Sequence, residues 1–188
     1  AVTALLPLTL FPLLGVTDIK TAGLPYANPN IYLFMGGFIL ALGIEASGLH
    51  KRLALKMLLL VGNSGARLVG GFMLVSALIS MWVMNTSTTL MLLPIGLAVC
   101  ASVSQTIPDM SSKDRKNFEV ALLLGIAYAA TIGGMSTLVG TAPNIIFAGF
   151  MKETYSIEIS FIDWMRLAVH LSFIMLIASW YALTSIVY

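Results

Sequence analysis

Long apolar runs, interrupted by short polar clusters, dominate this chain. They cover residues 1–16, 30–47, 68–83, 90–103, 118–151 and 167–187. A helix needs about 20 apolar residues to cross the hydrocarbon core of a bilayer, and charge-poor runs of this kind are typical of membrane spans. The pattern therefore predicts an all-α integral membrane protein with transmembrane helices.

The segments between these runs are short and polar. Turn-forming residues predict a loop at 17–29. Residues 48–63 combine basic and leucine side chains, a mixture that indicates an amphipathic helix lying in the membrane interface. We expect residues 64–67 to turn the chain back into the membrane and residues 104–117 to form a polar loop.

The first polar interruption is Met84-Asn85-Thr86-Ser87-Thr88-Thr89. Each flanking arm holds about 16 residues and reaches about 24 Å at the rise of an α-helix. The hydrocarbon core is about 30 Å thick. Because each arm is too short to cross the core, we predict that residues 68–103 form a re-entrant helical hairpin. Asn85 would lie at mid-membrane depth, and both ends would lie on the cytoplasmic side.

The second interruption is Gly133 to Asn144, inside the run 118–151. Its sequence GGMSTLVGTAPN contains three glycines and a proline, so we expect a broken helix there. Unwound backbone within a bilayer leaves polar groups that lipid cannot satisfy. Paired breaks of this kind mark the ion and substrate site of secondary transporters.

Composition and charge narrow the class further. The chain has 188 residues, of which 59% are hydrophobic and 10% charged, whereas soluble domains carry about 25% charged residues. A net charge of +2 gives no indication of nucleic-acid binding. The single cysteine, Cys100, cannot form an internal disulfide. Because the apolar runs extend to both ends, we expect the chain to be a fragment of a longer protein.

Basic residues flank the predicted hairpin on both sides. Lys51, Arg52, Lys56 and Arg67 precede it, and Lys113, Arg115 and Lys116 follow it. A hairpin returns to the side it left, so these residues share one face, which the positive-inside rule makes cytoplasmic. Two complete spans would also return the chain to the side it left, so the charge distribution does not distinguish them from a hairpin. Only the length of the arms and the polarity of the tip favour the hairpin.

The polar groups at membrane depth are neutral hydroxyls and amides. A hard monovalent cation such as sodium takes such oxygens in place of its water shell, whereas proton-coupled carriers more often place a titratable group in the pathway. The second arm of the hairpin also presents a helix N-terminus, which attracts anions. The residues therefore predict a shared site for sodium and an anionic carboxylate.

Other classes of protein fit these residues less well. The Ser80 hydroxyl could equally donate to a carbonyl of its own helical turn. Either polar cluster alone would more often form structural hydrogen bonds between helices. An intramembrane enzyme would need a nucleophile–base pair, paired aspartates or a metal set at depth. The chain offers only His50 and His170, so we predict no catalytic residues and no enzyme. A structural membrane subunit would not require two unwound segments.

At these motifs the chain resembles the divalent anion:sodium symporter family, which carries di- and tricarboxylates. SMWVMNTSTTLMLLPI resembles the family's first Ser-Asn-Thr hairpin tip, and IGGMSTLVGTAPN resembles its following broken helix. VTALLPLTLFPLLGV and YANPNIYLFMGGF are similar to upstream family segments. The resemblance covers nearly the whole chain and implies the N-terminal inverted repeat of an ion-transporter fold.

The resemblance also implies roles for individual residues. Sodium would be bound by Ser80 and Asn85 and by the backbone of Met84 and Gly133. Asn85 and Thr86 would contact a substrate carboxylate. The motif's serine is Met84 here, so a hydroxyl contact is lost while a carbonyl contact remains. The supporting residues of the broken helix are Gly134, Thr137, Thr141, Pro143 and Asn144.

The implied function is sodium-coupled symport of a small dicarboxylate such as succinate or malate. A related carrier for sulfate or an arsenic oxyanion is the alternative. Sodium is the coupling ion, and no organic cofactor is expected. The family works as a homodimer by elevator-like motion and has a second inverted repeat, which this chain lacks, so we expect the fragment alone not to transport.

By the same resemblance, residues 1–63 hold scaffold-side spans and the interfacial helix. Residues 64–151 form the hairpin and broken helix of the transport domain, and residues 152–188 a loop and a transmembrane helix. We expect the protein in a bacterial inner membrane.

Overall fold

The computed structural model describes residues 2–61, 64–106 and 111–187, and every regular element in these ranges is helical. The chain forms two compact units, Ala1–Gly36 and Gly37–Tyr188. Helix α3 (Pro29–Ala46) begins in the first unit and ends in the second. The prediction of an all-α membrane fold is confirmed.

The first unit contains short helices. They are η1 (Val2–Leu5), α1 (Leu6–Leu13), α2 (Ile19–Gly23) and η2 (Leu24–Ala27). The loop predicted at 17–29 is wrong over most of its length, because the Asp18 carboxylate caps α2. It accepts the N–H groups of Lys20 at 3.1 Å and Thr21 at 3.3 Å. The bonds from Thr21 lower the pKa of Asp18 most.

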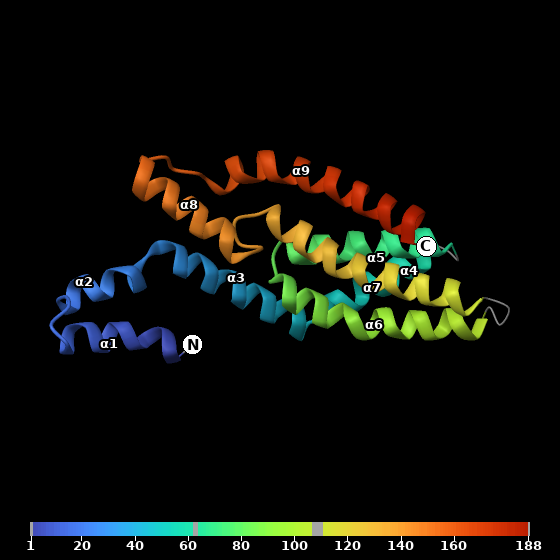
Figure 1. Ribbon diagram of the computed structural model, residues 1–188, viewed down its shortest axis with the longest axis horizontal. Helices are drawn as coiled ribbons and strands as arrows, with labels where there is room; N and C mark the ends of the chain where they lie inside the picture. The colour runs from blue at the N-terminus through green and yellow to red at the C-terminus, as the bar shows by residue number, and fades with distance from the viewer. Residues whose placement is uncertain (1, 62–63, 107–110, 188) are drawn as a thin grey trace. The chain divides into compact units, whose positions relative to one another are not determined.

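The second unit is built around three neighbouring helices, α5 (Gly65–Ser80), α6 (Asn85–Thr106) and α7 (Ser112–Met135). α5 and α6 form a hairpin, and α7 packs along both of them (Figure 1). Their shared core includes the fully buried Leu92 and Leu122. The remaining elements of this unit are α4 (Leu49–Val61), α8 (Ala142–Tyr155), α9 (Phe161–Ala182) and a π-helical turn, η3 (Leu183–Val187).

α5 and α7 are packed closely because α7 presents small residues to α5. Gly125, Ala129 and Gly133 recur every four residues on α7 and are buried. Such spacing lets helix backbones approach within a membrane. The buried Ser76 hydroxyl of α5 adds a hydrogen bond to the Ile126 carbonyl at 2.7 Å. These contacts hold the first arm of the hairpin against α7.

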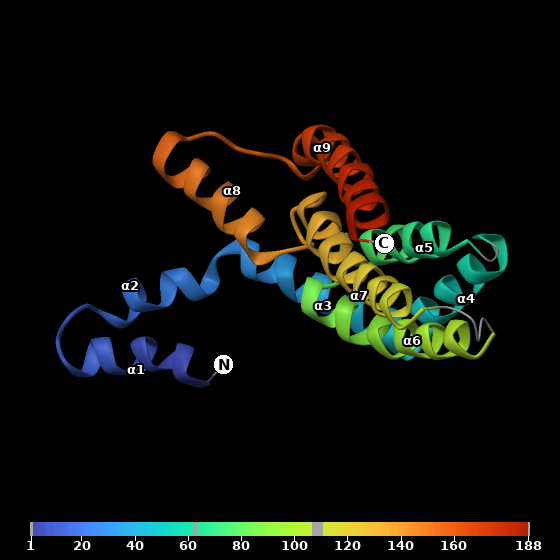
Figure 2. The same cartoon turned by 45° about the vertical axis from the view of Figure 1, so that its right-hand side comes forward.

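α9 lies along α5 and α7, as Figure 2 shows. Near its C-terminal end, the Trp180 indole donates to the Ala66 carbonyl at 2.8 Å. A Cβ at Gly70 would lie 2.9 Å from Trp180 Nε1, so the absence of a side chain at this position makes room for the indole. The start of the hairpin is thereby fixed against the last helix.

Three helices in the described residues are long and apolar enough to span a membrane: Asn85–Gln105, Ser112–Met135 and Phe161–Ser185. The bent pair Ile19–Ala27 and Ile31–Ala46 would make a fourth span if both helices crossed together. The arm-length argument for the hairpin holds for α5, with 16 residues, but is wrong for α6, with 22. The polar residues from Asn85 onward begin the helix instead of interrupting it. The re-entrant topology remains a prediction.

Three helix ends differ from the predicted boundaries: the start of α5, the end of α6 and the start of α7. α5 starts at Gly65, so the predicted turn at 64–67 is mostly helix. The polar loop is shorter than 104–117, because α6 runs to Thr106 and the Ser111 hydroxyl caps α7 by accepting the Asp114 N–H at 3.1 Å. A helix forms at Leu49–Val61 as expected, whereas residues 62–63 lie outside the described ranges.

Candidate functional site

The hairpin tip consists of a linker, Met81–Met84, between the last residue of α5 and the first residue of α6. Ser80 ends α5 and is fully buried. Its hydroxyl donates to Asn85 Oδ1 at 2.9 Å and lies 3.4 Å from the Val83 carbonyl. The alternative of a bond back to its own helical turn is not what the structure shows. Ser80 instead joins the two arms across the linker and orients the Asn85 amide.

The broken helix lies beside this tip. α7 ends at Met135, residues 136–141 turn, and α8 begins at Ala142 (Figure 1). The interruption was expected from Gly133 onward, but Gly133 and Gly134 are the last turn of α7. These two glycines provide close approach to the hairpin, while the turn itself begins at Ser136, whose N–H donates to the Gly133 carbonyl at 3.0 Å.

Three glycines bring the two segments into contact. A Cβ at Gly133 would lie 2.5 Å from Ala77 Cα, and a Cβ at Gly134 would lie 3.0 Å from Asn85 Cγ and closer still to Oδ1. A Cβ at Gly140 would collide with the Gly134 carbonyl and lie 2.9 Å from the Ser80 carbonyl. The structure thus brings Ser80, Asn85 and Gly134 together, whereas Gly133 faces Ala77 of α5. That Ser80, Asn85 and Gly133 share one cation stays a prediction.

A hydrogen-bond network centred on Thr137 closes the break. Its buried hydroxyl donates to the Met81 carbonyl in the hairpin linker at 2.5 Å and accepts the Gly140 N–H at 3.0 Å. The Asn144 amide donates to the Thr137 carbonyl at 2.7 Å and to the Gly134 carbonyl at 3.0 Å. The Asn144 side chain therefore satisfies one carbonyl of the turn, that of Thr137, and one at the end of α7, that of Gly134.

The other predicted members of the break lie at the start of α8. Thr141 is its N-cap residue, without a side-chain cap hydrogen bond, and the Asn144 N–H donates to the Thr141 carbonyl at 3.2 Å. Pro143 occupies the first turn, where its missing N–H costs nothing. These residues restart the helix and do not contact the Asn85 amide in any recorded hydrogen bond.

The first turn of α6 contains both exposed and buried polar residues. Thr86 and the Met84 side chain are exposed, and the Met84 carbonyl accepts the Thr88 N–H at 3.0 Å. The Thr89 hydroxyl donates back to the Asn85 carbonyl at 2.9 Å. The Thr88 side chain is fully buried, and its hydroxyl has no partner among the described residues.

The site is electrically neutral in its side chains. Its side-chain oxygens are the Ser80 hydroxyl and the Asn85 amide. The Gly133 carbonyl on the neighbouring α7 accepts the Ser136 N–H and has a lone pair left. The N-terminus of α6 adds unpaired N–H groups and partial positive charge. In the described part of the chain, no three His, Cys, Asp or Glu residues could hold a metal together. The arrangement suits a hard monovalent cation beside an anion.

Charged residues occur away from this site. Lys152 of α8 and Glu158 of the loop that follows form an ion pair at 2.7 Å, and the hydrogen bond from Lys152 lowers the pKa of Glu158. Both side chains are exposed, so this pair adds little stability. The His170 ring bonds to the Arg166 carbonyl at 2.7 Å within α9.

Aromatic residues near the break were not predicted to contact it. The Trp164 indole donates to the Met135 carbonyl at 2.9 Å and so satisfies the end of α7. Trp82 of the linker stacks on Phe161 with ring centroids 6.2 Å apart. Both contacts come from the start of α9 and join residues far apart in the chain, 29 positions for Trp164 and Met135 and 79 for Phe161 and Trp82, so only the tertiary fold could show them.

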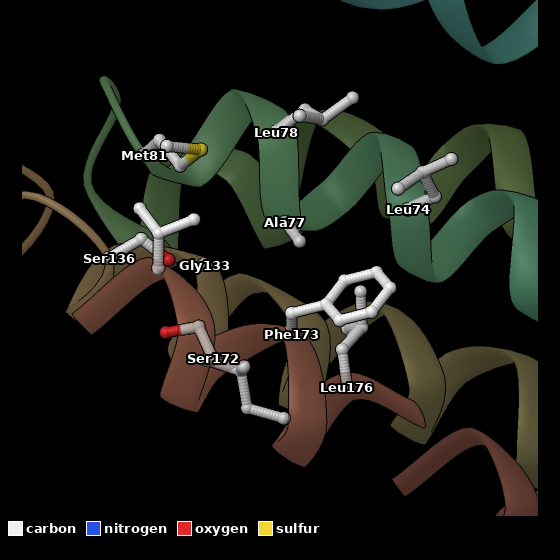
Figure 3. A pocket seen from close by; sticks show the side chains of 11 residues that line it. Leu74, Ala77, Leu78, Met81, Gly133, Ser136, Ser172, Phe173 and Leu176 are labelled. Atoms are coloured by element: carbon white, nitrogen blue, oxygen red, sulfur yellow. The ribbon is translucent and has the colours of Figure 1, made fainter. Parts of the chain in front are cut away.

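Two hollows border the region. An apolar groove of about 110 Å³ lies between α5, α7 and α9, with Gly133 at its edge, and only Ser136 and Ser172 bring hydroxyls to it (Figure 3). A second hollow, of about 380 Å³, is lined by Glu45, Lys51 and Ser87 with three apolar residues of α6. The groove is apolar except for two hydroxyls and carries no charge, and the second hollow carries one charge of each sign. The hairpin tip therefore stays the candidate anion site.

Comparisons with known proteins agree with this description. A family model described as "Citrate transporter" (CitMHS) matches residues 1–188. The chain is 40% identical over 185 residues to the sodium-dependent dicarboxylate transporter SdcS of Staphylococcus saprophyticus, covering 96% of this chain and 35% of that protein. It is 38% identical over 181 residues to SdcS of Staphylococcus aureus, with the same coverage. The chain thus spans about a third of the length of these relatives.

Proposed function

The chain belongs to the citrate transporter family, and we propose that it is part of a carrier that couples sodium to the uptake of a small dicarboxylate. Its helices and bacterial relatives make it an integral protein of a bacterial plasma membrane. The relatives named above are sodium-dependent dicarboxylate transporters, which supports this substrate and this coupling ion.

One observation supports the proposal most: the hairpin tip and the broken helix meet through neutral oxygens. Ser80 and Asn85 are joined by a 2.9 Å hydrogen bond, and Gly134 contacts the Asn85 amide. Sodium would bind the Ser80 hydroxyl, the Asn85 amide oxygen and the carbonyls of Met84 and Gly133. Binding would turn Asn85 Oδ1 from an acceptor of the Ser80 hydroxyl into an ion ligand.

The anion would bind on the exposed side of the same turn. Asn85 Nδ2 and the Thr86 hydroxyl would donate to one carboxylate, and the first N–H groups of α6 would add to the attraction. Because Met84 replaces the motif's serine, this carrier would hold that carboxylate with one hydroxyl fewer. Bound sodium would offset the negative charge of the carboxylate, so each ligand would strengthen the binding of the other.

The complete carrier would contain more than this chain. We propose that a second inverted repeat, with its own sodium and carboxylate contacts, completes the site, and that two copies form a homodimer. Residues 64–151 would move as the transport domain against 1–63, carrying the substrate unchanged, without enzymatic chemistry or an organic cofactor.

The test is uptake by purified full-length carrier in sealed vesicles. Radiolabelled succinate should accumulate with an inward sodium gradient and should not accumulate with potassium in its place. Unlabelled malate should compete. Competition by citrate, sulfate or arsenate, with none by succinate or malate, would assign a different anion. Sodium-independent uptake would contradict the proposed coupling, and no transport of any of these anions would favour a structural subunit.

A further inference from the structure

Thr137 connects the hairpin tip, the turn of the break and the start of α8 without belonging to the proposed ion ligands. Its hydroxyl is completely buried and uses both a donor and an acceptor function, to Met81 and from Gly140. Its carbonyl accepts from Asn144. In the described residues, no other side chain of the break donates to the hairpin linker.

The Met81 carbonyl is an informative partner because it lies in the linker. Met81 follows Ser80 directly, and three residues later the linker ends at Met84, before Asn85. The Met81 N–H is already bonded to the Ala77 carbonyl at 3.1 Å, which continues the helical path of α5. A bond to the Met81 carbonyl therefore fixes where the chain leaves α5 and, through the short linker, where Asn85 can lie.

The same hydroxyl fixes the other half of the site. By accepting the Gly140 N–H, it holds Gly140 in the crowded position between the Gly134 and Ser80 carbonyls. Asn144 then ties the Thr137 and Gly134 carbonyls together. One hydroxyl thus relates Ser80 and Asn85 on the hairpin to Gly133 and Gly134 on α7.

We propose that Thr137 is a positioning residue for the cation site, because its hydroxyl sets the distance between the hairpin tip and the broken helix. The inference rests on the proposed sodium coupling. It assigns Thr137 no contact with sodium or with the dicarboxylate. A hydroxyl at this position is needed, and its methyl group is not.

The experiment compares four variants of the full-length carrier: Thr137→Val, Thr137→Ala, Thr137→Ser and Ser76→Ala. Thr137→Val keeps the shape and removes the hydroxyl, whereas Thr137→Ser keeps the hydroxyl. Ser76→Ala is the matched control, because Ser76 also joins the hairpin to α7 by a buried hydroxyl-to-carbonyl bond, at 2.7 Å, but lies a helical turn before the tip. Thermal unfolding is followed as sodium is raised, and sodium-dependent uptake is measured at saturating substrate.

We expect Thr137→Val to raise the sodium concentration for half-maximal stabilisation by roughly five- to fiftyfold, because two buried partners lose their hydrogen bond. Uptake at saturating sodium should fall less than the sodium affinity does. Thr137→Ser should stay within about threefold of wild type, and Ser76→Ala should lower the unfolding temperature without changing the sodium dependence.

Each other outcome overturns the inference or its premise. Wild-type sodium dependence in Thr137→Val, or an equal loss in Ser76→Ala, would show that Thr137 only contributes to general stability. If Thr137→Val and Thr137→Ala both fail to give folded carrier, the hydroxyl is required for folding and not for ion binding. If sodium does not stabilise the wild-type carrier at all, the proposed function fails instead.

Discussion

Gly134 lies where the two functional segments touch, and replacing it by alanine should damage the site while sparing the fold. A Cβ there would be 3.0 Å from Asn85 Cγ, whereas ordinary contact begins at 3.4 Å, so the amide has to retreat by at least about 0.4 Å. Its oxygen, which is closer, must move further. The 2.9 Å bond from Ser80 would then break, and a cation would lose its amide ligand.

The magnitudes favour a loss of binding over a loss of stability. A hydrogen bond or ligand contact to a charged group contributes about 1.5–3 kcal/mol, or roughly ten- to a hundredfold in affinity. Alanine in place of glycine stabilises a helix interior by about 0.5–1 kcal/mol, and the obstructing atoms belong to a side chain that can rotate. Gly134→Ala should therefore unfold near the wild-type temperature and require at least tenfold more sodium.

Gly133→Ala provides the contrast. Its Cβ would meet the backbone of α5, 2.5 Å from Ala77 Cα and 2.7 Å from Ala77 C, and backbone cannot rotate away. Overpacking of this kind costs about 1–3 kcal/mol or more. Gly125→Ala, in the same helix, faces only the side chains of Met73 and Val69 and serves as the tolerant control.

The assay measures thermal unfolding of the full-length carrier over a sodium series, together with sodium-dependent dicarboxylate uptake. We expect Gly133→Ala to lower the unfolding temperature even without sodium, and Gly134→Ala to lose only the stabilisation by sodium. Gly134→Ala with the wild-type sodium midpoint would refute the placement of the Asn85 amide in the cation site.

Three further predictions concern single groups. Asn85→Ala should weaken both sodium and substrate dependence of uptake by roughly ten- to a hundredfold, since one amide serves both ligands; unchanged uptake at limiting sodium and substrate would remove Asn85 from the site. Thr88→Val replaces a buried hydroxyl that has no partner among the described residues, so thermal unfolding of the carrier should show neutral or increased stability; marked destabilisation would mean that the rest of the carrier or an ion supplies a partner. Because Ser80, Asn85, Gly133 and Thr137 do not titrate, sodium-dependent stabilisation without substrate should be the same at pH 6 and pH 8; a shift of the sodium midpoint with pH would place a titratable group at the site.

The residues of the site could be found from the sequence because they are polar or conformationally special in an apolar background. Asn85 and Asn144 stand out for that reason, and the pairing of two interrupted segments indicated that they meet. The helical background followed from apolar run length alone. The family resemblance supplied the individual roles, which remain proposals.

The predicted helix boundaries that were wrong, and the contacts that were missed, depend on where helices begin and end and on tertiary packing. Asn85 begins α6, so polar residues that suggested an interruption extend the second arm to 22 residues. Gly133 and Gly134 suggested unwinding, yet they lie in α7, because a glycine chosen for close packing looks the same in sequence as one chosen for a turn. The Trp164 bond to Met135 joins residues 29 apart, which no local pattern encodes.

The bond between Thr137 and Met81 joins residues 56 positions apart, and this separation has a consequence for biosynthesis. At about 5–20 residues per second, a ribosome needs roughly 3–11 s to proceed from the linker to its partner. During that interval the linker carbonyl and the Asn85 amide have neither the break nor its glycines to pack against. The nascent hairpin is then a polar loop at the membrane without its partner, and the time for which it stays so is set by translation speed across α6 and α7. Synonymous codon changes that slow this stretch should therefore lower the yield of folded carrier without altering a single residue.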